Sequence, residues 1–352
     1  MPGARGDEMT FNAVLCGCGA MAKGWLRAIQ STPEISGAIR IAGLVDLNEN
    51  TARALAEEFA LTDAVIGTDL RAVLAETKAD ILFDIVIPQA RFAVVEAGLD
   101  AGCHVLSEKP LAASMEEAAT LVELAKKAGK IHAVVQNRRF IAGIRRLRRA
   151  LEDGVIGDLT AIHCDFFLGP HFGGFREEMK NVLLLDMAIH TFDAARFVAN
   201  EKPLSVFCVE KNPAGSWYAH GASANAIFEF SNDVVFTYRG SWCAEGERTS
   251  WEARWRLIGS KGMILWDGED NFSASVAGDD KGLLRGFKTV NVSDVVSEKD
   301  TRGHASVILS FLDSIRTGEM PETASFDNIN SLAMVIGAIE SARLGQRVSI
   351  AA

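Results

Sequence analysis

The chain has 352 residues, 48% of them hydrophobic, and a formal net charge of -10 at pH 7. This length allows two domains with separate cores and excludes a small module held together by disulfides. The acidic balance argues against nucleic acid and anionic membranes as main partners, because both require a basic face. The one basic run, residues 138–149, has helical spacing and is interpreted as a solvated or ligand-facing helix side, with a nucleic-acid-binding arm as the alternative.

No segment reaches the roughly 18 apolar residues of a membrane span, and residues 1–12 lack the apolar core of a secretion signal. We therefore expect a cytoplasmic protein. The six cysteines show neither zinc spacing nor a disulfide pattern, which predicts reduced thiols and no metal site. Residues 1–9 are expected to form a loose tail, with Met9 as an alternative start.

Residues 10–137 alternate short, continuous apolar runs with amphipathic stretches. The apolar runs predict buried strands, and the stretches between them have the spacing of helices. Such alternation is typical of a parallel α/β sheet of the Rossmann type, joined by right-handed crossovers. Strands are expected at 11–17, 39–46, 80–88, 102–108 and 130–136, with helices at 22–32, 48–60, 90–102 and 115–129.

Residues 138–352 have a different pattern, with successive strands and few helices between them. Such a pattern predicts a large, mostly antiparallel sheet in a second domain of the α+β type. The last two helices can return to pack on the first domain. Strands are expected at 159–169, 203–211, 222–231, 233–243, 251–260 and 262–268, with helices at 182–200, 306–316 and 328–344.

The stretch "GCGAMA", Gly17 to Ala22, follows the first strand and opens a helix. Glycines allow the tight turn and the close approach to a pyrophosphate, whose charge the helix N-terminus favours. Gly17, Gly19, Ala20 and Met21 are therefore candidate cofactor residues. The alternative is a tight turn that binds no ligand.

Asp46 ends the second strand, where an acid can accept hydrogen bonds from an adenosine ribose. An acid there would repel a 2′-phosphate, and no arginine directly follows it. The pattern therefore favours NAD as the cofactor, with NADP as the alternative.

Two further segments place polar residues among apolar ones. In "SEKPLAAS", Glu108 and Lys109 follow an apolar strand, Pro110 suits a first helical turn, and Ser114 can cap the next helix. Along the apolar helix 182–200, Asp186, His190 and Asp193 are spaced to lie on one stripe. That stripe is either a satisfied core pair or a catalytic group, and its position at the start of the second domain favours catalysis.

Together these motifs resemble the Gfo/Idh/MocA family of NAD(P)-dependent oxidoreductases, named for glucose-fructose oxidoreductase and inositol dehydrogenase. The resemblance covers nearly the whole chain. The segments that carry it are "GCGAMA", Asp46, Pro88, "AGCHVLSEKPLA", "QNRRF", "LEDGVIGDLTAI", "LDMAIHTFD" and "GAIESARLGQRVSI".

The resemblance implies a role for each matching residue. Lys109 would polarise the reacting hydroxyl beside the nicotinamide, and Glu108 would contact the cofactor. His190 would be the general acid and base, a role that suits an unperturbed pKa of about 6.5, and Asp186 would orient it. Asp193 would support this group or contact substrate. Pro88 and Asn137 complete the implied cofactor site.

The sequence departs from the family pattern near the substrate. "KNVLLLD" replaces the glycine triplet that often precedes the aspartate, and Arg91 lies near the position of a usual histidine. Arg176 corresponds to the arginine of a Trp-Arg pair, which makes it a candidate substrate contact. His163 and His171 are further candidates, the alternative for both being a structural role.

Trp242, Trp251 and Trp255 recur in the later strands. In the family this sheet often forms a subunit interface, so an aromatic face predicts a homo-oligomer, and packing in the core is the alternative.

We expect an enzyme that moves hydride between NAD(H) and a secondary alcohol or ketone of a sugar, sugar acid or cyclitol. A second hypothesis is a glycosidase or lyase that oxidises and re-reduces its substrate with retained NAD. A third is a non-catalytic ligand sensor, which has no need of Lys109, Asp186 and His190 together. The sequence does not name the substrate.

Overall fold

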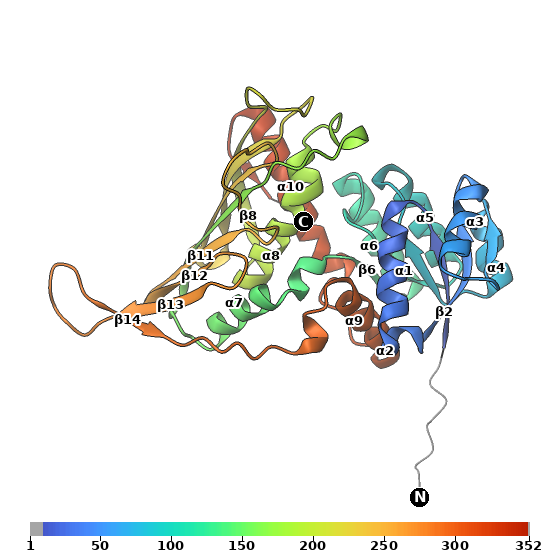
Figure 1. Cartoon of the computed structure of the whole chain (residues 1–352), viewed down its shortest axis with the longest axis horizontal. Helices are drawn as coiled ribbons and strands as arrows, with labels where there is room; N and C mark the ends of the chain where they lie inside the picture. Colours follow the sequence, from blue (N-terminus) through green and yellow to red (C-terminus); the bar gives the residue numbers. More distant parts are fainter. Residues whose placement is uncertain (1–9, 351–352) are drawn as a thin grey trace, which may run out of the picture. The chain divides into compact units, whose positions relative to one another are not determined.

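The computed structural model describes residues 10–350 and divides into two compact units (Figure 1). The first unit combines residues 10–136 with 304–329, and the second combines 137–303 with 330–350. The predicted tail at residues 1–9 lies outside the described residues.

Within the described residues, the first unit holds a six-stranded sheet in the order β3-β2-β1-β4-β5-β6. Every pair is parallel, which confirms the predicted Rossmann sheet. The half-exposed strand β3 was not predicted, because three residues give too little pattern. The strands are β1 (Phe11–Cys16), β2 (Ile39–Val45), β3 (Val65–Gly67), β4 (Ile81–Asp84), β5 (His104–Ser107) and β6 (His132–Val134).

The helices of the first unit largely follow their local signals. Ser114 caps α6 as predicted, with its Oγ accepting the Glu117 N–H at 3.2 Å. Pro110 does not lie in that helix, because α6 begins only at Met115. The predicted helix near 306–316 belongs to this unit, where α9 contacts α1, α2 and β5. The helices are α1 (Ala20–Ser31), α2 (Pro33–Ser36), α3 (Glu49–Glu58), α4 (Leu70–Thr77), α5 (Pro88–Asp100), α6 (Met115–Ala128) and α9 (His304–Thr317).

The second unit is built on a nine-stranded sheet within the described residues, in the order β14-β13-β12-β11-β7-β10-β9-β8-β15. Only β7 and β10 pair in parallel, which confirms the mostly antiparallel prediction. The last three strands were not predicted. The strands are β7 (Leu159–Phe167), β8 (Pro203–Lys211), β9 (Ser223–Phe230), β10 (Val235–Ser241), β11 (Arg254–Gly259), β12 (Gly262–Trp266), β13 (Phe272–Ala277), β14 (Phe287–Val290) and β15 (Val348–Ser349).

Helices cover one face of this sheet (Figure 1). The predicted helix 182–200 is a π-helix, η3 (Leu183–Ala188), that continues directly into α8 (Ile189–Ala199). The others are α7 (Ala142–Glu152) and α10 (Ser325–Leu344), and the unit boundary falls within α10. Short 3₁₀ turns are η1 (Asn137–Phe140), η2 (Gly174–Arg176), η4 (Ser231–Asp233) and η5 (Glu298–Asp300).

Two of the three tryptophans noted in the sequence are buried in the core of the second unit. Trp242 is 2% exposed and Trp255 is 3% exposed, and both belong to the hydrophobic core, whereas Trp251 is 45% exposed. The alternative prediction, packing in the core, is therefore confirmed for Trp242 and Trp255. These two side chains do not support the predicted oligomer.

All six cysteines lie within the described residues and have free thiols there. Between residues 10 and 350, no helix is both long and apolar enough to cross a membrane. The same residues contain no cluster of three metal-ligating side chains.

Candidate functional site

The glycine loop follows β1, at the point where the sheet order changes direction between β1 and β4. Ligands of open α/β sheets bind at such a point, beyond the carboxyl ends of the strands. Gly17 has φ +96°, and a Cβ there would lie 2.7 Å from the carbonyl carbon of Ile85. The loop can therefore pass β4 only with glycine. At Gly19, which precedes α1, a Cβ would meet nothing within 4 Å, so the backbone faces open space.

Asp46 is tied to this loop. Its Oδ2 accepts the Cys18 N–H at 2.8 Å, and its Oδ1 accepts the Asn48 N–H at 2.9 Å. The carboxylate is half-buried and keeps lone pairs for further donors, such as ribose hydroxyls. Burial raises the pKa of the Cys18 thiol to about 12, so this residue stays neutral beside the acid.

Three exposed apolar side chains flank the same edge. Met21 is the second residue of α1, Leu47 follows Asp46, and Ile87 precedes α5, and they are 46%, 97% and 67% exposed. Open backbone at a helix start, a fixed acid and apolar side chains beside them match the phosphates, ribose and flat rings of a dinucleotide. The residues present therefore fit NAD.

Pro88 is the first residue of α5, and Asn137 opens η1 as the first residue of the second unit. Both are half-buried.

Glu108 follows β5 and points into the first unit, where it is only 7% exposed. Its Oε1 accepts the Trp25 indole N–H at 2.8 Å and lies 3.6 Å from His304 Nε2. Burial alone raises the pKa of Glu108, but His304, Trp25 and the Lys109 ammonium outweigh it and hold this pKa below its usual value. Glu108 is therefore ionised, and its carboxylate contacts side chains of the protein interior. The sequence did not predict these contacts.

Lys109 comes next, half-buried at the carboxyl edge of the sheet. Its backbone N–H donates to Glu108 Oε2 at 3.2 Å, and its peptide bond to Pro110 is cis. Arg91, noted only as a departure from the family pattern, is fully buried beneath this turn.

In the second unit, Asp186 lies in the π-helix. Its Oδ2 accepts the Arg176 Nε–H at 2.8 Å, and the two side chains are 16% and 31% exposed. The Arg176 guanidinium also lies 5.0 Å from the ring centres of Phe172 and Phe175. Arg176 therefore serves first as the partner of Asp186 while keeping part of its side chain open to solvent.

His190 lies one helical turn later and lines a small pocket of the second unit. The buried side of this pocket is apolar, and an ion pair between Arg138 and Glu252 contributes charge. The half-exposed Trp251 adds an aromatic surface. The lining residues are Arg138, Ile144, Met187, His190, Thr191, Ala194, Trp251, Glu252 and Trp255.

Asp193 has a different environment, although the helical spacing predicted one stripe. It is 1% exposed, and its two oxygens accept the Arg139 Nε–H and Nη2–H groups at 2.7 Å each. The Ser331 hydroxyl donates to Oδ1 at 2.6 Å. A bidentate pair this deeply buried favours a supporting role over contact with substrate.

The two remaining histidine candidates lie on a strand and in a loop of the second unit. His163 lies on β7, on the face opposite the core residues Ile162 and Cys164, and burial with Arg256 lowers its pKa. His171 stacks on Trp217 with 3.8 Å between ring centres and lies 3.4 Å from Glu245.

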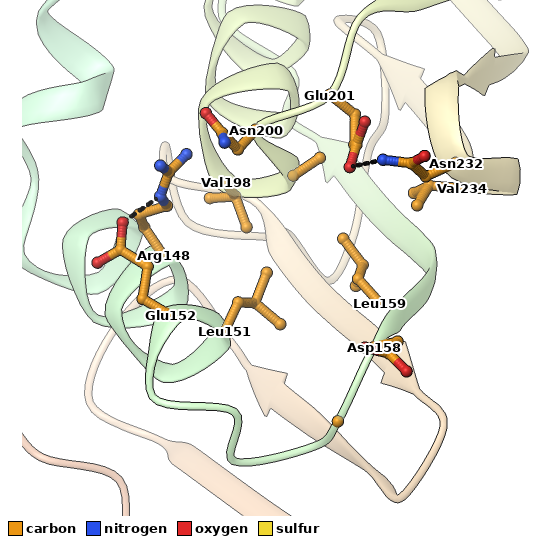
Figure 2. A pocket seen from close by; sticks show the side chains of 12 residues that line it. Arg148, Leu151, Glu152, Asp158, Leu159, Val198, Asn200, Glu201, Asn232 and Val234 are labelled. Carbon is orange, nitrogen blue, oxygen red and sulfur yellow. Dashed lines mark hydrogen bonds and ion pairs between the residues drawn. The ribbon is translucent and has the colours of Figure 1, made fainter.

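Another pocket, of about 440 Å³, lies between α7, the end of α8 and η4 (Figure 2). Arg148 in this pocket already donates to Glu152 and to the Phe197 carbonyl, and Asn232 donates to Glu201. Of the described residues, none with a predicted catalytic or cofactor role lines it.

Comparisons with known proteins match both units. A family model described as an oxidoreductase family with an NAD-binding Rossmann fold matches residues 11–136, and the Gfo/Idh/MocA C-terminal domain model matches residues 144–265. An uncharacterized protein y4oX of Sinorhizobium fredii is 25% identical over 97% of this chain and 96% of its own. Inositol 2-dehydrogenase of Rhizobium meliloti is 24% identical over 97% of this chain and all of its own.

A crystal structure of an oxidoreductase from Agrobacterium radiobacter, in complex with NAD+, L-tartaric acid and magnesium, superimposes with a TM-score of 0.82. It is 20% identical and covers 97% of this chain and 99% of its own, and it therefore supports the fold.

Proposed function

This chain belongs to the Gfo/Idh/MocA family of oxidoreductases, and from that premise we propose that it transfers hydride between NAD(H) and a secondary alcohol or ketone of a sugar, sugar acid or cyclitol. Family membership makes it an NAD-binding oxidoreductase. One relative is named as an inositol 2-dehydrogenase, and the oxidoreductase from Agrobacterium radiobacter was solved with L-tartaric acid, a hydroxy acid. Both names support the proposed substrate class.

One observation supports this proposal most directly, namely the order of groups along one edge of the parallel sheet. Strands β2, β1, β4 and β5 are neighbours, and they end at Asp46, the glycine loop, the segment before Pro88, and Lys109. The cofactor-binding groups and the lysine therefore share one edge. A lysine at that edge can act on a substrate hydroxyl beside the bound dinucleotide.

The proposed chemistry divides into three roles. When bound, the nicotinamide supplies or accepts the hydride. The Lys109 ammonium polarises the substrate oxygen, which favours loss of its proton during oxidation. His190 accepts that proton during oxidation and returns the proton to the substrate during reduction. Asp186, four residues earlier and held by Arg176, is the proposed orienting carboxylate.

For the cofactor we propose that Gly17, Gly19, Ala20 and Met21 hold the pyrophosphate and Asp46 the ribose. Pro88 and Asn137 remain proposed neighbours of the cofactor. The buried contacts of Glu108 support a different role, in which it fixes the start of the Lys109 turn from within. Among the substrate candidates, the partial exposure of Arg176 favours it over Asp193.

We also propose a homo-oligomer formed through the open face of the second unit's sheet. Phe207, Ile227 and Leu265 point away from the core and are 41%, 50% and 37% exposed, and Phe207 pairs directly with Ile227. The loop between β13 and β14 adds Leu283 and Leu284, which are 102% and 87% exposed. Exposed apolar side chains that pair across neighbouring strands, as Phe207 and Ile227 do, support an interface on this face. For localisation, we propose the cytoplasm.

The test is nicotinamide absorbance with NAD and a panel of inositols, aldoses, sugar acids and simple hydroxy compounds, run beside the Lys109→Ala variant. Turnover that the variant loses would support the proposal and identify a substrate. Equal turnover in the variant would reject the role of Lys109. A flat trace with confirmed NAD binding would favour an internal redox cycle or a ligand sensor.

A further inference from the structure

Arg91 lies in the first turn of α5 and is fully buried. A buried guanidinium requires acceptors for its donors, because removal of the charge from water is costly. Its Nε donates to Asp84 Oδ2 at 2.7 Å, its Nη2 donates to the Val86 carbonyl at 2.6 Å, and its Nη1 donates to the Pro110 carbonyl. One side chain therefore joins the end of β4 to the residue that follows Lys109.

The acceptor Asp84 is itself held by neighbouring strands. It is fully buried, accepts the Val86 N–H at 3.2 Å, and receives the Ser107 hydroxyl. Because the Ser107 hydroxyl donates its hydrogen bond to Asp84, the Ser107 oxygen accepts a hydrogen bond from His132 Nε2, which lies 3.1 Å away. These contacts connect the last residues of β4 and β5 to the first residue of β6, below the Lys109 turn.

The opposite side of Lys109 is held by the preceding residue. Glu108 is fixed by Trp25 of α1 and by His304 at the start of α9. Lys109 therefore lies between two anchored neighbours, one held through its carboxylate and the other through its carbonyl oxygen.

We infer that Arg91 is a positioning residue that sets the place of Lys109 through the Pro110 carbonyl. The inference rests on the proposed function of Lys109. Arginine suits this task because its rigid planar fork can hold a carboxylate and two carbonyls at once, whereas a lysine ammonium has neither the fork nor the reach. The Asp84 partner keeps the guanidinium charge balanced in the interior.

Two variants separate positioning from folding. The double variant Asp84→Asn/Arg91→Met removes both buried charges together, so neither is left uncompensated, and it releases the Pro110 carbonyl. Arg91→Lys keeps the charge balance but loses the fork. The control Arg71→Met/Asp100→Asn makes the same substitutions in an ion pair that is 59% and 55% exposed and also joins α5.

The first measurement needs neither substrate nor cofactor. Lysines are reductively methylated with isotope-labelled formaldehyde, and the Lys109 signal in a two-dimensional NMR spectrum is assigned by its loss in Lys109→Arg. In both Arg91 variants we expect this signal to shift and sharpen toward the signals of Lys126 and Lys127, which are exposed on α6. The control variant should leave it in place. A Lys109 signal that stays unchanged in both Arg91 variants would overturn the inference.

The second measurement is turnover on a substrate found with the panel. We expect kcat to fall by about 10- to 100-fold in both Arg91 variants with an unchanged KM for NAD, as for a displaced catalytic group. If Lys109→Ala keeps full turnover, the proposed function fails, and the NMR result still decides whether Arg91 positions the lysine. If Lys109→Ala loses turnover and the Arg91 variants keep it, the positioning inference alone fails.

Discussion

His132 offers a direct test of the buried network, through the substitution His132→Gln. The side chain is 1% exposed, and its Nε2–H donates to Ser107. Burial, followed by the nearby Arg91 charge, lowers the pKa of His132 from 6.5 to about 3. The folded protein therefore holds this histidine neutral. Glutamine can place an N–H near the same point and does not titrate in this range.

The magnitude follows from linkage. Between pH 6.5 and pH 3, the unfolded chain binds a proton at His132 that the folded chain does not bind. Stability in the wild type therefore falls as pH falls through this window, by about 1.4 kcal/mol per unit. From pH 8 to pH 5 the loss at this site is about 2 kcal/mol. The glutamine variant should not show this loss.

The assay is urea unfolding followed by circular dichroism at pH 8 and pH 5. At pH 8 we expect the variant to be less stable by about 1 kcal/mol, as for a modest change of a buried hydrogen bond. From pH 8 to pH 5, the free energy of unfolding of the variant should rise relative to that of the wild type by about 2 kcal/mol. His171→Gln makes the same change at a side chain that is 62% exposed and controls for the substitution. A difference between wild type and His132→Gln that is equal at both pH values would refute the reasoning.

Three further predictions concern the proposed chemistry and assembly. His190→Ala should lower turnover by about two to four orders of magnitude with little change in NAD affinity, and steady-state kinetics with equal turnover would reject the general acid and base. Asp46→Ala should weaken the binding of NAD and reduce the ratio of NAD affinity to NADP affinity, both measured by fluorescence titration. An unchanged ratio would mean that other residues select the cofactor. Ile227→Asp should give a smaller species in light scattering with the folded spectrum retained, whereas an unchanged mass would reject the open sheet face as the interface.

The sequence by itself determined the features that depend on residues close in the chain. The parallel sheet, the glycine turn at Gly17 and the cap at Ser114 each follow from local periodicity or turn chemistry. Asp46 and Lys109 were predicted as site residues from equally local signals, since Asp46 ends one predicted strand and Lys109 directly follows another. Strands β13, β14 and β15 were missed because short strands at a sheet edge depend on pairing with distant neighbours.

Only the tertiary structure decided which polar groups are partners. The helical spacing placed Asp193 with His190, but residues 54 and 138 positions away, Arg139 and Ser331, hold its carboxylate. Glu108 meets Trp25 from 83 residues earlier, and Arg91 reaches the Pro110 carbonyl 19 residues later. Burial forces every such charge to find a partner, but the partner is whichever group the packed elements bring near, and sequence spacing carries no record of that choice.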